Sequence, residues 1–85
     1  MTYKVVVGED ARRGMAGLEP AQRRAVNDAV RGELAMRPLS VGSEYEGHGS
    51  GALRLLVLEA ARVSIGYRVY SDRVEVEIVW LLGHP

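Results

Sequence analysis

The chain contains no cysteine among its 85 residues, which excludes disulfide bonds, thiol chemistry and cysteine-based zinc sites. No hydrophobic run approaches the ~20 residues of a membrane-spanning helix. Low-complexity tracts and internal repeats are absent as well. The first residues lead directly into a strand-like run, so we expect no signal peptide. These absences predict a cytoplasmic protein that is not associated with a membrane.

Net charge is also lacking, because 11 basic residues are balanced by 11 acidic residues. Proteins that hold nucleic acid mainly through its phosphates are usually basic, since counterion release supplies much of the affinity. The neutral balance disfavours general RNA or DNA binding and leaves room only for a local basic patch. With 47% hydrophobic residues, the chain is expected to form one globular domain over residues 1–85, with a modest core.

The clearest structural pattern is a strict alternation of apolar residues near the C-terminus. Apolar side chains occupy every second position of residues 74–82, and the segment 62–70 alternates in the same way. Residues 71–73 form a polar break that is short enough for a hairpin. This period is typical of strands that have one buried face and one solvated face.

The alternation assigns a face to each side chain of the hairpin. We expect Tyr67 and Trp80 in the core rather than as platforms for base stacking. Tyr70, beside the turn, either contacts a base from the open face or has no role beyond the turn. The charged residues predicted on the open face are Arg62, Arg68, Glu75 and Glu77.

The first half of the chain predicts one strand and two helices. Residues 3–7 form a β-branched run that favours a strand. Residues 11–18 favour a short helix, which two glycines weaken. A longer helix is expected to begin at Pro20 and to end before Pro38, because proline disfavours helical geometry in the preceding residue.

Residues 39–50 are rich in glycine and serine and predict a long loop. A further strand over residues 52–59 completes the order β-α-α-β-β-β. The predicted fold class is therefore α+β, with an antiparallel sheet. The two N-terminal helices pack on one face of this sheet and leave the other face open.

This pattern resembles the RelE/ParE superfamily of toxins from bacterial type II toxin–antitoxin systems. The resemblance covers nearly the whole chain. It rests on size, element order, an arginine on the third strand, a valine-rich fourth strand ending in Leu-Gly-His-Pro, and a glycine-containing loop that leads into Gly51-Ala52-Leu53-Arg54. It implies a RelE-like fold and a cognate antitoxin as partner. A homodimer is a further expectation.

The superfamily implies two activities. RelE-type members are endoribonucleases that cleave mRNA in the ribosomal A site through the ribose 2′-hydroxyl, with no metal or other cofactor. ParE-type members inhibit DNA gyrase. The cleavage requires a proton acceptor for the 2′-hydroxyl, positive charge on the pentavalent phosphate and a proton donor to the leaving oxygen.

The resemblance maps basic positions of the superfamily onto Arg54 and Arg62. Both are expected to project from the open face, where a guanidinium suits a phosphate. From the residues alone there is a competing explanation. Cross-strand pairing of Arg62 or Arg68 with the two glutamates would neutralise a solvated face in the same way.

YoeB-like members of the superfamily carry a catalytic histidine near the C-terminus, which makes His84 the candidate general acid or base. The alternative for His84 is a terminal histidine without a partner. A loop glutamate is the base in such members, so Glu46 and its neighbour Glu44 are candidates; the alternative is a solvated carboxylate. His48 is expected on the surface, and two histidines are too few for a metal site.

The chain also departs from the RelE pattern. It stops at Pro85 without the further basic residues of RelE-type members, and it has Glu75 and Glu77 on the predicted open face. At an effective dielectric constant near 20, a carboxylate beside a phosphate costs roughly a few kcal/mol. These departures favour two alternatives, a non-catalytic or gyrase-inhibiting member that works by protein–protein binding, and a small structural or oligomerising domain.

Overall fold

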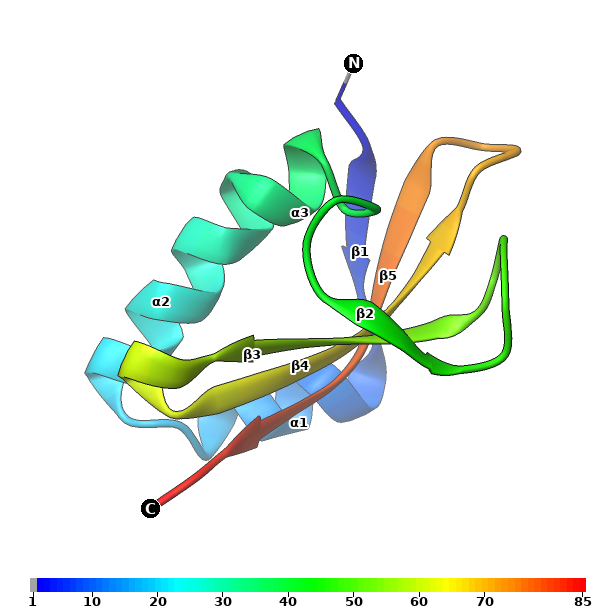
Figure 1. Cartoon of the computed structure of the whole chain (residues 1–85). Helices are drawn as coiled ribbons and strands as arrows, with labels where there is room; N and C mark the ends of the chain where they lie inside the picture. The colour runs from blue at the N-terminus through cyan, green and yellow to red at the C-terminus, as the bar shows by residue number, and fades with distance from the viewer. Residues whose placement is uncertain (1) are drawn as a thin grey trace.

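A mixed five-stranded sheet with helices on one face makes up the computed structural model, which describes residues 2–85 (Figure 1). The strands are β1 (Lys4–Val7), β2 (Ser43–Glu46), β3 (Leu53–Leu58), β4 (Val63–Tyr70) and β5 (Glu75–Gly83). The helices are α1 (Glu9–Ala16), α2 (Pro20–Arg31) and α3 (Glu33–Met36), and a 3-10 turn, η1 (Glu59–Ala61), joins β3 to β4. The strand order is β1-β5-β4-β3-β2.

The predicted α+β class, with helices packed on one face of the sheet, is confirmed, but the sheet is not purely antiparallel. β1 runs parallel to β5, with Val5 opposite Val76. The direction of β1 was not predictable from its pattern, because side chains alternate in the same way in parallel and antiparallel strands.

The predicted loop over residues 39–50 contains the edge strand β2, which pairs antiparallel with β3. All the residues of β2 are exposed. A strand without a buried face shows no apolar alternation, so the sequence pattern gave no sign of it.

The predicted long helix is divided at Gly32, whose backbone angles (φ −99°, ψ −100°) lie outside the helical region. It therefore forms α2 and the single turn α3. As predicted, α2 begins at Pro20, and a reciprocal capping box between Glu19 and Gln22 satisfies its first turn. α1 begins at Glu9, after Gly8, two residues before the predicted start at residue 11.

The core lies between the helices and the sheet. Its strand members are Val63, Ile65, Tyr67, Val69, Val76, Ile78 and Leu81, its helix members are Ala11, Val26, Ala29 and Leu34, and Leu18 joins it from the turn between α1 and α2. Tyr67 is fully buried, as predicted. Within residues 2–85 no helix has the length and apolar character that a membrane crossing requires.

α1 approaches β5 closely at Gly14. A Cβ atom at this position would lie 2.6 Å from the carbonyl oxygen of Leu81, so glycine is what allows the helix to rest on the strand. The same glycine weakens the helix in isolation. The packing of α1 on β5 therefore stabilises a helix that its own residues favour only weakly.

A bulge in β5 decides which way the last residues of the chain face. Tyr67 lies opposite Ile78 and Gly66 lies opposite Trp80, so the extra residue Val79 is accommodated between the two pairs. Trp80 consequently lies over Gly66 on the open face, and Leu81 turns into the core in its place. The expectation that Trp80 is a core residue is wrong, because the apolar alternation runs through the bulge without a visible break.

Candidate functional site

The face of the sheet that the helices leave open carries apolar as well as charged side chains. Its residues on β3, β4 and β5 are Leu53, Leu55, Val57, Ser64, Gly66, Arg68, Tyr70, Glu75, Glu77, Trp80 and Leu82. Val57 and Leu82 have exposed fractions of 44% and 55%, which makes the region beside Ser64 largely apolar.

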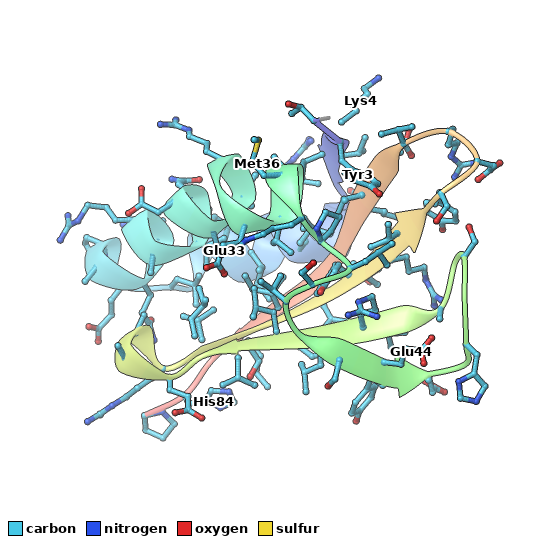
Figure 2. All side chains as sticks on the ribbon, turned by 45° about the horizontal axis from the view of Figure 1, so that its top comes forward. Tyr3, Lys4, Glu33, Met36, Glu44 and His84 are labelled. Carbon is cyan, nitrogen blue, oxygen red and sulfur yellow. The ribbon has the colours of Figure 1, made fainter. Side chains whose placement is uncertain are left out.

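Arg62 and His84 meet where β4 begins and β5 ends. Figure 2 labels His84 at this end of the sheet. The backbone N–H of His84 donates a hydrogen bond to the carbonyl oxygen of Arg62 at 2.7 Å. Both side chains are exposed. Of the residues predicted to act in catalysis, these two are the ones that the fold brings together.

The backbone of Arg62 is held in a left-handed conformation (φ 57°, ψ 51°) just after η1. This conformation costs an ordinary residue roughly 1–2 kcal/mol. The side-chain amide of Gln22 donates hydrogen bonds to the carbonyl oxygens of Ala61 and Arg62, at 3.2 and 3.1 Å. Together with the bond from His84, these contacts fix the carbonyl end of the turn from which the guanidinium projects.

Ser64 is a site residue that the sequence analysis missed. Its Oγ lies 2.6 Å from Nε2 of His84, and only 7% of the residue is exposed. One signal was available, since Ser64 follows Arg62 at strand spacing, so the alternation that predicted Arg62 on the open face also predicts Ser64 there. The bulge at Val79, which brings the histidine to the same face, left no mark in the sequence.

A cavity of about 640 Å³ adjoins this pair of residues, between the α1–α2 turn and the end of β5. Arg62 and His84 border it together with Leu18, Gln22 and Gly83. The volume is within the ~300–1,000 Å³ that is usual for small-molecule sites.

Arg54 does not project from the open face as expected. It lies opposite Tyr67 and shares the helix-facing side of the sheet with that residue. Its Nε donates to the Tyr67 hydroxyl at 3.3 Å, and its Nη2 donates to the carbonyl oxygen of Val41 at 3.0 Å. The Tyr67 hydroxyl, which has one proton to donate, lies 2.9 Å from the carbonyl oxygen of Pro38 and 2.8 Å from that of Val41. In this position Arg54 ties the segment after α3 to the sheet.

Replacing Arg54 by methionine, which keeps an unbranched chain but removes the guanidinium, should lower the free energy of unfolding by roughly 1–2 kcal/mol, because the Tyr67 hydroxyl and the carbonyl oxygen of Val41 lose the hydrogen bonds that Arg54 donates. Urea denaturation followed by circular dichroism measures the change. The Arg54→Lys variant should recover part of the loss, since it keeps the charge but not the fork. An unchanged denaturation midpoint for Arg54→Met would contradict the tether.

Glu46 and Glu44 lie at the opposite end of the sheet from His84, as the labelled side chains of Glu44 and His84 show in Figure 2. Glu46 pairs with Leu53, whereas Leu58 pairs with Val63 next to Arg62. At ~3.3 Å per residue, this spacing separates the two ends of β3 by roughly 17 Å. The structure does not bring Glu46 together with Arg62 and His84.

Glu44 closes the loop between β2 and β3. Its Oε2 accepts a hydrogen bond from the backbone N–H of Gly49 at 2.9 Å, and its Oε1 lies 3.2 Å from Nδ1 of His48. The pKa of the Glu44 carboxyl is lowered, mainly by the hydrogen bond from Gly49 and in second place by the contact with His48. Within residues 2–85 no group of three or more histidine, aspartate or glutamate side chains is arranged to hold a metal ion.

The remaining charges of the open face are engaged locally. Arg68 lies opposite Glu77, but its Nη1 donates to the carbonyl oxygen of Gly51 at 2.8 Å. Glu77 accepts a hydrogen bond from the Tyr70 hydroxyl, whose pKa is raised by burial and by this bond. Arg73 contacts Glu75 at 3.6 Å. Arg62, in contrast, forms no ion pair with any residue in the described part of the chain.

This chain shares the fold of RelE toxins. Solved structures of such toxins match the chain over nearly its full length. A chain of the toxin–antitoxin complex RelBE2 from Mycobacterium tuberculosis is 24% identical, with a TM-score of 0.86, and the match covers 99% of this chain and 100% of that one. A chain of the archaeal RelE–RelB complex from Pyrococcus horikoshii OT3 is 22% identical, with a TM-score of 0.73 and coverages of 98% and 96%.

A mutant of the E. coli toxin RelE in the free state is 16% identical, with a TM-score of 0.76 and coverages of 98% and 84%. The predicted resemblance is thus confirmed for the fold. A scan against protein-family models and a search of curated proteins find no match to the sequence.

Proposed function

We propose that this chain is the toxin of a type II toxin–antitoxin system and that it cleaves mRNA on the ribosome. The observation that carries the proposal is the meeting of Arg62 and His84 at one end of the sheet, in a chain with the fold of RelE toxins. A guanidinium free of ion pairs is suited to bind a phosphate, and an imidazole is suited to transfer a proton near neutral pH.

In the proposed reaction, the ribose 2′-hydroxyl attacks the adjacent phosphorus and the bond from phosphorus to the 5′-oxygen breaks. Arg62 stabilises the extra negative charge of the pentavalent phosphate. His84 donates a proton to the leaving 5′-oxygen. The 2′-hydroxyl proton passes to water, because Glu46 lies at the other end of the sheet. The proposed steps use these two side chains and water, without a cofactor.

The proposed partner of the toxin is a cognate antitoxin. The similar chains from M. tuberculosis and P. horikoshii come from complexes of this kind. On this chain, the exposed apolar residues Val57 and Leu82 offer the antitoxin a surface on the open face. Since the proposed substrate is mRNA on the ribosome, the toxin would act in the cytoplasm.

Expression of the chain alone in a bacterial host, with mapping of mRNA 5′ ends, tests the proposal. We expect growth arrest, together with new 5′ ends at codons in the ribosomal A site. Co-expression of the protein encoded by the neighbouring gene should restore growth. Purified chain that fails to cut mRNA on stalled ribosomes would refute the ribonuclease assignment.

A second function is favoured by the composition of the open face. Apart from Arg62, its charges are engaged locally, and the surface beside Ser64 is apolar rather than basic. Such a surface suits protein–protein binding, as in a non-catalytic toxin or an inhibitor of DNA gyrase. Growth arrest without mRNA cuts but with gyrase-dependent DNA damage would establish this function instead.

A further inference from the structure

The contact between His84 and Ser64 makes the two ring nitrogens of the imidazole unequal, because only one of them is hydrogen-bonded. Nε2 lies 2.6 Å from the Ser64 Oγ. Nδ1 has no hydrogen bond within residues 2–85. The backbone bond to Arg62 fixes the Cα of His84, and the serine fixes its ring.

We propose that Ser64 is a positioning residue, which accepts a hydrogen bond from Nε2–H of His84 and so makes Nδ1 the atom that transfers the proton to the substrate. The inference rests on the proposed function for the identity of the reaction, whereas the placement of the ring does not depend on it. Ser64 is fit for this role because its backbone is part of β4 and only 7% of the residue is exposed.

In the imidazolium form both ring nitrogens carry a proton. Nε2–H donates to Oγ of Ser64, and Nδ1–H faces the substrate. As the bond between phosphorus and the 5′-oxygen breaks, its electron pair stays on that oxygen, which takes the Nδ1 proton. The product is a neutral imidazole whose Nε2–H still donates a hydrogen bond to Oγ of Ser64. Water later returns a proton to Nδ1. The serine stays hydrogen-bonded throughout and gains or loses no proton.

The test compares Ser64→Thr with Ser64→Val. These two side chains have nearly the same shape and are both favoured in strands, so they differ essentially in the hydroxyl group. The His48→Gln background leaves His84 as the only histidine, since the chain has two. In ¹⁵N-labelled protein we expect an Nε2–H proton signal that is protected from exchange with water. Ser64→Thr should keep the signal, and Ser64→Val should lose it.

Cleavage of ribosome-bound mRNA gives the second readout. The rate of Ser64→Val should fall by about tenfold or more, a part of the ~10²–10⁴ that a positioned acid contributes, and Ser64→Thr should retain most of the rate. A protected Nε2–H signal in Ser64→Val, or equal rates for the two variants, would overturn the inference. If the unmodified chain cuts no mRNA, the proposed function fails, and the exchange data still decide whether Ser64 positions the ring.

Discussion

Replacing Arg62 by glutamine should abolish growth arrest and lower the rate of mRNA cleavage by about 10²–10³, as expected for the loss of one group that stabilises transition-state charge. Arg62 has no ion pair in the described part of the chain, so its guanidinium is available to the phosphate. Its fold-stabilising contacts come from its backbone carbonyl. The substitution should therefore leave the free energy of unfolding nearly unchanged.

The matched control is Arg31→Gln, which removes an exposed arginine from the end of α2, away from the open face. It should arrest growth as the unmodified chain does. His84→Ala should reduce cleavage by about 10²–10⁴, the usual share of a general acid. Because the two groups act on one transition state, the double variant should lose less than the product of the two single effects. Full toxicity of the double variant would refute both assignments.

Replacing Gly66 by alanine should destabilise the chain by about 3 kcal/mol, at the upper end of the usual cost of overpacking. A Cβ atom at position 66 would overlap the indole ring of Trp80, which lies over this glycine on the neighbouring strand. Gly66 is itself buried in the middle of β4, so its backbone cannot shift without disturbing the core strand. For a domain of this size, the loss is a large fraction of total stability.

Urea denaturation followed by circular dichroism measures this effect. Adding Trp80→Leu to Gly66→Ala should recover much of the loss, because the smaller side chain makes room for the new methyl group. Gly17→Ala is the control, since a Cβ there meets its nearest atom at 3.6 Å and the backbone angle φ is −85°. If Gly66→Ala unfolds at the same urea concentration as Gly17→Ala, the close packing of Trp80 on the sheet is disproved.

The sequence predicted those elements whose burial alternates or whose ends carry recognisable residues. The hairpin of β4 and β5 and the start of α2 at Pro20 belong to this group. It did not predict β2, which has no buried face, or the direction of β1. Gly32 divides a helix whose apolar pattern continues through it, and a weak propensity was the only local sign.

The candidate site was predictable in part, for a related reason. Arg62 and His84 were predicted as candidates and lie together in the structure, but Arg54 was expected on the wrong face of the sheet. β3 reads Leu-Arg-Leu-Leu-Val-Leu, so both of its faces are apolar and no alternation assigns the arginine to a side. A long arginine can lie along the helix-facing side and still reach polar groups at the rim, here the carbonyl oxygens after α3. Ser64 was missed because its partner depends on the bulge in the neighbouring strand.

The bulge in β5 determines on which face of the sheet the residues that follow it lie. Counted along a regular strand, His84 has the same parity as Val76 and Ile78 and would lie beneath the helices. The one extra residue at Val79 inverts the count, so the imidazole emerges on the other surface beside Ser64. Insertion or deletion of a single residue between Ile78 and His84 would move the His84 side chain to the helix-covered face of the sheet. Insertion or deletion of two residues would keep His84 on the same face and shift it only along the strand direction. The face on which His84 lies is therefore set by the number of residues in the last part of β5, in addition to the identity of the side chains.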